Sequence, residues 1–546
     1  MSDTKLVRGT LVLTAATFLS KLLGLIYVIP FTLLVGQTGN ALYQFGFIPY
    51  TVLLSMATLG VPLAVSKFVS KYQSMGDYQV GYRLLKSGIL FMFINGLLAA
   101  LALYFSAPLV ASWIISDPTE LKGNSMEDII FTIRMVSAAL LIVPVMAIIR
   151  GYFQGHQSMG PTAVSQVIEQ IVRIIFILLA VYFILNIKEG SLGLAVGVAT
   201  LGAFFGALAG LVVLVYYWFK RRAFVVKEVN ASKVSYSLSL KDIYKEVISY
   251  AIPLSFVGLA IPLFQLIDLF TVTNALTHSG LMEQGEPVTF FAIFSSTAHK
   301  IILIPMALAT AFSITLVPTI TKSYVTNDQI ALQEQITKTY RIILFITVPA
   351  VVGLSTLSFP VFSTFYWPND LEMGGTVLRY YAPIALLFSL FAVSGAILQG
   401  INKQKYAVFA LGSGLLIKLS LNYVLLYYIG PFGGILATYL GYGLAIFIMF
   451  WSIRKYAQYR FSQLAKQTIA IFLFAAIMGV YVGIITTYIQ QYFPIVSWSN
   501  AFIVLLSGIL MGGVIYILLS YRFGLAQYVL GARFHKRATR TEPNEG

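Results

Sequence analysis

The sequence contains no cysteine and only four histidines. A chain without cysteine forms no disulfide framework and offers no thiolate as a nucleophile or as a zinc ligand. The histidines lie far apart, without the close spacing of metal ligands: His156, His278, His299 and His535. We therefore expect no metal site in this protein.

Charged residues are also scarce, at 10% of the chain against 58% hydrophobic residues. A soluble domain carries about 25% charged residues, so this chain lacks the polar surface that water requires. It also lacks a GxxxxGK[ST] phosphate loop, a nucleophile elbow and an HExxH motif. The composition predicts one membrane domain, and the missing motifs predict a protein that is not an enzyme, binds no ATP and needs no cofactor.

Long apolar runs fill the sequence instead. A membrane-spanning helix needs about 20 apolar residues, and each run should be helical because lipid offers no hydrogen-bond partner to an open backbone. Fourteen runs meet this length, at residues 10–36, 43–66, 84–115, 129–149, 161–187, 192–219, 247–273, 289–320, 342–366, 376–399, 406–429, 432–453, 467–489 and 500–521. The predicted fold is an all-α integral membrane protein of about fourteen transmembrane helices.

The basic residues predict the orientation of these helices. If the N-terminus is cytoplasmic, only three of the 36 lysines and arginines lie in outside loops: Lys122, Lys188 and Arg379. Five lie deep within the runs, Arg379 lies at the outer end of its run, and all the others lie in inside segments or, for Lys86, at the inner end of a run. This bias predicts that both chain ends are cytoplasmic. The net charge of +16 then indicates topology and not nucleic acid. We expect the basic tail to bind anionic membrane lipids, through Arg533, Lys536, Arg537 and Arg540.

Short motifs recur in the same order in the two halves of the chain. Gln154-Gly155 stands as far before Arg173 as Gln399-Gly400 stands before Lys418, and Val61-Pro62 recurs as Val317-Pro318. Because six helices are an even number, both copies cross the membrane in the same direction, as in transporters that hold substrate between two lobes. We predict an N-lobe at 1–222, a cytoplasmic linker at 223–246, a C-lobe at 247–455, two further helices at 456–522 and a basic cytoplasmic tail at 523–546.

Two lysines lie deep within the runs, where a charge at the bilayer centre costs at least about 2.5–3.5 kcal/mol. Lys21 lies in the first run, and Lys300 lies in the eighth beside His299. Neither reaches a membrane surface easily, so each lines a cavity or joins a buried ion pair. A lysine ammonium is a compact charge suited to phosphate. We predict that both face a cavity that binds an anion.

The other deep charges suggest pairs. Glu169 and Arg173 are four residues apart and predict an intrahelical ion pair, while Arg173 keeps donors for a substrate. Asp268 and Lys418 are expected to neutralise each other. Bases outnumber acids within the runs, which again favours an anionic substrate.

Three segments carry a family resemblance. They are Leu19-Ser-Lys-Leu-Leu-Gly24, the stretch from Ala298 to Lys322, and the stretch from Arg150-Gly-Tyr-Phe-Gln-Gly155 to Arg173. The first two resemble the first and eighth helices of the MurJ-type lipid II flippases of the MOP superfamily. The third is similar to the YtgP/SpoVB-like polysaccharide-transporter branch of Gram-positive bacteria. The resemblance covers nearly the whole chain.

The resemblance implies a flippase that works by alternating access. The family places essential arginines where this chain has Lys21 and Lys300, so the charge is kept but the bidentate guanidinium is lost. The implied substrate-binding residues are these two lysines with Arg173, Glu169 and His299. The two helices after the second lobe imply a groove for a lipid tail.

Some members of the family bind sodium in the second lobe. Asp268, Asn422 and Thr438 resemble the sodium-binding positions, and Lys418 falls where a further ligand would stand. The resemblance implies that the Lys418 ammonium takes the place of the ion, so that transport does not depend on sodium.

The resemblance thus implies a monomeric, multi-pass protein of the bacterial cell membrane that moves lipid II from the inner to the outer leaflet. With no nucleotide site, the membrane potential or an ion gradient would drive it. A flippase for another polyprenyl-linked polysaccharide unit is the alternative in the same fold. Less favoured are a drug antiporter, because a basic cavity repels cationic drugs, and a non-transporting scaffold for wall synthesis.

Overall fold

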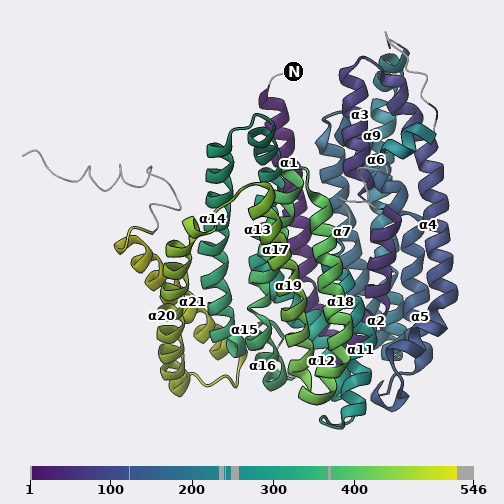
Figure 1. Ribbon diagram of the computed structural model, residues 1–546. Coiled ribbons are helices and arrows are strands. Elements are labelled where there is room, and N and C mark those ends of the chain that lie inside the picture. The colour runs from purple at the N-terminus through teal and green to yellow at the C-terminus, as the bar shows by residue number, and fades with distance from the viewer. Residues whose placement is uncertain are drawn as a thin grey trace, which may run out of the picture. The chain divides into compact units, whose positions relative to one another are not determined.

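The computed structural model describes residues 3–58, 60–121, 123–230, 232, 239, 241–247, 258–366 and 370–525. Figure 1 follows the chain from α1 in purple to α21 in yellow. Every regular element in the described part is a helix, and no strand is found there. The helices are α1 (Asp3–Ile26), α2 (Val28–Thr58), α3 (Val61–Ser74), α4 (Tyr78–Ile114), η1 (Pro118–Leu121), α5 (Met126–Ser137), η2 (Ala138–Leu141), α6 (Val143–Gly155), α7 (Met159–Tyr182), η3 (Phe183–Ile187), α8 (Leu192–Thr200), α9 (Gly202–Asn230), α11 (Ala260–Ser279), α12 (Glu286–Ala292), η4 (Ile293–Thr297), α13 (Ala298–Val325), α14 (Gln329–Thr356), α15 (Ser358–Tyr366), α16 (Leu371–Tyr381), α17 (Ile384–Gly400), α18 (Gln404–Ile429), α19 (Pro431–Tyr456), α20 (Ser462–Tyr492) and α21 (Trp498–Arg522).

Thirteen helical stretches in the described residues are long and apolar enough to cross a membrane. The first of them, Val12–Ser74, is 63 residues long and takes in most of the first two predicted runs. Large apolar side chains such as Phe105 and Phe447 are largely exposed, at 72% and 69%, which suits a surface that faces lipid. The prediction of an all-α membrane protein is confirmed. The number fourteen and the cytoplasmic chain ends stay predictions.

Several predicted helix boundaries were wrong. The sequence suggested a loop between residues 36 and 43. The chain does break at Gly36, where the first run ends, but the helix resumes directly after this kink without a loop. Gly36 bends the helix there with φ 64° and ψ −172°, a conformation that is open to glycine. Asn40 holds the bend together, because its side-chain amide donates to the Gly36 carbonyl at 3.1 Å and to the Thr32 hydroxyl at 2.8 Å.

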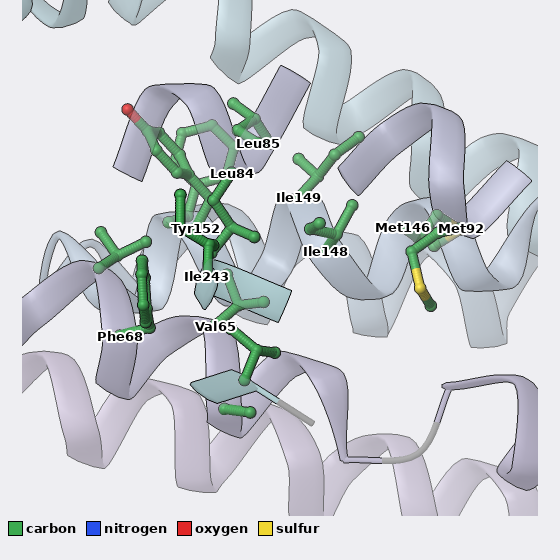
Figure 2. Close-up of a cluster of buried hydrophobic side chains, with 14 of the residues drawn as sticks. Val65, Phe68, Leu84, Leu85, Met92, Met146, Ile148, Ile149, Tyr152 and Ile243 are labelled. Atoms are coloured by element: carbon green, nitrogen blue, oxygen red, sulfur yellow. The ribbon is translucent and has the colours of Figure 1, made fainter. Parts of the chain in front are cut away.

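The predicted linker 223–246 is also more structured than expected. Helix α9 continues to Asn230, and residues 241–247 form a further helical turn. Figure 2 shows Ile243 from this turn among Val65, Leu84 and Tyr152, in one buried apolar cluster. Glu246 pairs with Lys71 of α3 at 2.6 Å. Residues 241–247, at the end of this linker, are therefore docked on the helices of the first half.

Some residues with predicted roles lie outside the part of the chain that the structure describes. The basic tail residues Arg533, Lys536, Arg537 and Arg540 lie outside the described residues, as do residues 248–257 of the seventh predicted helix. Their predicted roles stay predictions.

The helices gather into two compact units. The first contains Met1–Ser296 and Asn422–Pro431, and the second contains Thr297–Leu421 and Phe432–Gly546. In the first unit α7 packs against α1 and α9, and in the second α13 packs against α17. The lobe boundaries that the sequence suggested stay a prediction.

Turns of the same kind recur at matching places in the two halves. Helices α6 and α17 end at Gly155 and Gly400, and two residues later Gln157 and Asn402 both have positive φ, at 54° and 57°. A Cβ on Gly155 would approach Val69 of α3, and one on Gly400 would approach Ile320 of α13. Matching backbone turns and close contacts support the internal repeat that the sequence motifs predicted.

Within the first unit, polar side chains join α4 to α11. Asn274 accepts a hydrogen bond from the Ser116 backbone at 2.9 Å and donates one to the Trp113 carbonyl at 2.9 Å. One helical turn further along α11, His278 Nδ1 lies 2.8 Å from the hydroxyl of Tyr423. The end of α18 is thereby tied to the end of α11.

Candidate functional site

A polar stripe runs along α7, the helix that carries two of the predicted binding residues. Ser165, Glu169 and Arg173 are spaced by four, so they lie on one face of the helix. Helix α9 packs beside this face through glycines. A Cβ on Gly206 would lie 2.7 Å from the Glu169 carbonyl oxygen and 2.9 Å from Arg173 Cβ. Glycine on α9 thus brings this helix against the charged stretch of α7.

Glu169 is the centre of an ion cluster. Its Oε1 accepts a hydrogen bond from Arg173 Nη2 at 2.9 Å, which is the intrahelical pair that the spacing predicted. Its Oε2 accepts one from Arg150 Nη2, also at 2.9 Å. Each carboxylate oxygen of Glu169 is therefore matched by one guanidinium, and all three side chains are largely buried.

Arg150 was not among the predicted site residues. The sequence placed it just past the fourth apolar run, whereas α6 continues to Gly155 and keeps Arg150 within the helix. The available signal was the stripe on α7, where one buried acid is flanked by polar residues at every fourth position. Such a stripe needs a partner from another helix, and Arg150 is a base close by in the sequence.

Three tyrosines face the same cluster. Tyr43 and Tyr50 lie seven residues apart on α2, which places them on one face, and Tyr27 lies between α1 and α2. All three lie within electrostatic range of the Arg173 guanidinium, and Tyr27 and Tyr43 share a side-chain hydrogen bond. The Tyr50 hydroxyl and the Arg173 Nε–H are buried and have no hydrogen-bond partner among the described residues. These groups are available to a bound anion.

Lys21 lies on α1, the neighbour of α7. The two helices are joined by a hydrogen bond of 3.1 Å from the Thr17 hydroxyl to the Gln166 side chain. Lys21 is one turn from Thr17 on the same face, and its side chain is exposed. Among the described residues it takes part in no salt bridge. The structure therefore leaves its ammonium available.

His299 and Lys300 begin α13 in the second unit. His299 is 3% exposed, its Nδ1 lies 2.9 Å from the Tyr381 hydroxyl, and its ring packs against Phe388. Lys300 is half-buried beside it. The π-helical turn η4 precedes them, and such turns are frequent at functional sites. The binding roles of both residues stay predictions.

The four residues of the predicted second-lobe cluster fall into two groups. In the first unit, the Asn422 amide donates to Asp268 Oδ1 at 3.1 Å and to the Thr271 hydroxyl at 2.6 Å. In the second unit, Lys418 Nζ donates to the Thr438 hydroxyl at 2.5 Å, and Lys418 is fully buried. Asp268 and Lys418 belong to different units, so their pairing stays a prediction. The described residues contain no group of three or more metal-ligating side chains.

The chain matches known proteins along almost its whole length. The family model described as polysaccharide biosynthesis protein matches residues 6–324. The chain is 45% identical to the lipid II flippase MurJ of Bacillus subtilis (strain 168), over 97% of this chain and 98% of that protein.

Two solved structures share the fold. One is the lipid II flippase MurJ in an inward closed conformation, with a TM-score of 0.64 and 17% identity, covering 94% of this chain and 98% of that one. The other is an inward-facing multidrug resistance transporter of the MATE family in the MOP superfamily, with a TM-score of 0.63 and 16% identity, covering 79% of this chain and 94% of that one. At these identities the two structures support the fold alone. The evidence on function comes from the Bacillus subtilis relative, which is 45% identical in sequence.

Proposed function

This chain belongs to the polysaccharide biosynthesis protein family, and from that membership we propose that it is a lipid II flippase of the bacterial cell membrane. It moves the precursor from the inner to the outer leaflet and is a transporter, not an enzyme. The observation that carries the proposal is the 45% identity to the Bacillus subtilis flippase along almost the full length of both chains. A relative of that identity and coverage usually keeps its substrate class.

The bases within the membrane bind the pyrophosphate of the substrate. Lys21 and Arg173 of the first unit and Lys300 of the second are the phosphate-binding residues in this proposal. Glu169 and His299 orient their neighbours. The protein acts as a monomer, and the membrane potential or an ion gradient drives transport because the sequence holds no nucleotide motif.

The experiment uses cells in which this protein is the only lipid II flippase. An enzyme that cleaves lipid II is added outside the cells, and the cleaved fraction is measured before and after depletion of the protein. We expect the accessible fraction to collapse and lipid II to accumulate inside. Unchanged access would overturn lipid II as the substrate.

Lys300→Ala tests the site in the same cells. We expect this variant to reach the membrane in normal amount and to fail to restore external cleavage, because a charge that binds pyrophosphate is lost. Lys300→Arg keeps the charge and is the matched control. A fully active Lys300→Ala variant would remove Lys300 from the site.

A flippase for another polyprenyl-linked glycan is the second candidate. It is favoured by the family description, which names polysaccharide biosynthesis in general. If depletion leaves lipid II exposure unchanged and a different lipid-linked glycan accumulates inside, this second function replaces the first.

A further inference from the structure

Glu169 divides its carboxylate between two arginines of different helices. Oε1 accepts from Arg173 on the same helix, and Oε2 accepts from Arg150 on α6. The Glu169 side chain is 11% exposed and the two arginines are 13% and 14% exposed. A buried carboxylate with one base would form a neutral pair, but with two bases the cluster keeps one positive charge.

Arg150 is held in place by more than its charge. Its Nε and Nη2 both donate to the Ser165 hydroxyl, at 2.9 and 2.5 Å, and Ser165 is fully buried. With Nη2 also on Glu169 Oε2, the guanidinium is held at the carboxylate oxygen that Arg173 does not bind. It therefore takes up one Glu169 oxygen and leaves only the other to Arg173.

Arg173 has fewer of its hydrogen-bond donors satisfied than Arg150. Its Nη2 binds Glu169, but its Nε–H is buried and has no hydrogen-bond partner among the described residues. The buried hydroxyl of Tyr50 also lacks a partner there and interacts electrostatically with Arg173. A buried donor without an acceptor costs about 1–3 kcal/mol. An anionic oxygen beside Arg173 would satisfy the Nε–H and the surplus charge, and the Tyr50 hydroxyl is a further unpartnered group within electrostatic range of the same guanidinium.

We propose that Arg150 is a positioning residue that neutralises Glu169, so that Arg173 keeps a net positive charge for a phosphate oxygen of the transported lipid. The proposal rests on the proposed function and assigns a role to a residue that does not itself touch the substrate. The ligand class is a polyprenyl pyrophosphate, because its charge lies at the end of a tail that stays in lipid. Without Arg150, Glu169 would compete with the phosphate for the Arg173 guanidinium.

The charge balance makes a double variant informative. Arg150→Gln leaves the neutral Glu169–Arg173 pair, and we expect binding of undecaprenyl pyrophosphate to weaken about tenfold. Arg150→Gln combined with Glu169→Gln restores the single positive charge, so affinity should return to within about threefold of the unchanged protein. Binding is measured on the purified full-length protein in nanodiscs. Undecaprenol, which lacks the phosphates, should bind alike to all variants.

A purely structural cluster would behave differently. If Arg150 only holds α6 to α7, the double variant loses a second set of contacts, and its affinity stays as low as that of Arg150→Gln or falls further. That result overturns the proposal. Arg134→Gln is the matched control, because Arg134 lies over the Tyr104 ring on other helices, and its affinity should not change.

This experiment tests the proposed function and the role of Arg150 separately. If the unchanged protein does not bind undecaprenyl pyrophosphate, the proposed function and this inference fall together. If it binds and the double variant does not recover, only the role of Arg150 is lost. Thermal unfolding of each variant shows whether weak binding reflects a damaged fold.

Discussion

Buried polar side chains within the spans are stabilised in different ways in this protein. Glu169 meets two arginines, Lys418 meets the hydroxyl of Thr438, and His299 meets the hydroxyl of Tyr381. Each arrangement lowers the cost of taking a polar group out of water. Lys21 stands apart, because its side chain is exposed and is in no salt bridge among the described residues.

We therefore expect Lys21→Ala to reduce transport without reducing stability. The substitution removes a charge that holds nothing else in place, and loss of one charged contact to phosphate corresponds to about tenfold in affinity. External cleavage of lipid II measures the transport, and thermal unfolding of the purified protein measures the stability. Lys21→Arg should stay active. If Lys21→Ala unfolds more easily and transports normally, Lys21 has a structural role instead.

A second prediction at this scale concerns sodium. The family resemblance predicts that Lys418 stands where relatives with a sodium site have a further ligand, and its ammonium donates a hydrogen bond to the Thr438 hydroxyl. We expect flipping to stay within about twofold when sodium is replaced by potassium, because a fixed ammonium supplies the positive charge that a cation would bring. Transport by the purified protein in liposomes, with equal membrane potentials in both buffers, is the measurement. Loss of flipping without sodium would contradict the substitution of Lys418 for the ion.

What the sequence could predict at the residue scale was set by distance along the chain. The Glu169–Arg173 pair follows from a spacing of four on one helix. Arg150 was missed because its partner lies across a helix–helix turn, and only the packing of α6 on α7 brings the two together. The surroundings of His299 were also beyond the sequence, since Tyr381 lies 82 positions away.

Among the helices, the close approach of α7 and α9 depends on glycine. We expect Gly206→Ala to destabilise the protein by about 1–3 kcal/mol, because the added Cβ would press on the backbone of Glu169 and on Arg173, and overpacking has that cost. Binding of undecaprenyl pyrophosphate should fall as well, since Arg173 is displaced. Thermal unfolding and the nanodisc assay test the two effects.

Gly160→Ala is the matched control for this change. Gly160 also lies in α7, but a Cβ there would meet nothing within 4 Å. It should be neutral or slightly stabilising, since alanine favours helix. Equal effects of the two substitutions would mean that the tight contact between α7 and α9 is unimportant.

Helix positions were predictable because apolar length is a direct requirement of the membrane. Their ends were not, because helices continue beyond the apolar core wherever side chains cap or cover them. Helix α3 runs to Ser74 and α9 to Asn230, through residues that a hydropathy argument assigns to loops. The helix that resumes directly after Gly36 was missed for a related reason, since the backbone is helical on both sides of the kink.

For the molecule as a whole, the sequence predicts an orientation that can be measured directly. The chain has no cysteine, so a single introduced thiol reports one position. We expect a membrane-impermeant maleimide to label Glu127→Cys in intact cells and to label Ser74→Cys only after the membrane is broken. Both side chains are exposed, so the side of the membrane alone separates them. The reverse labelling would invert the predicted topology.

The first compact unit is also discontinuous along the chain, since residues 1–296 share it with residues 422–431. Tyr423, which contacts His278, comes 145 positions after it. A ribosome makes about 5–20 residues per second, so synthesis of residues 297–421 takes on the order of 6–25 s. During that time the early helices are already in the membrane without their last segment. Biogenesis of this protein must therefore separate insertion from final packing, and the early helices have to avoid other partners while they wait.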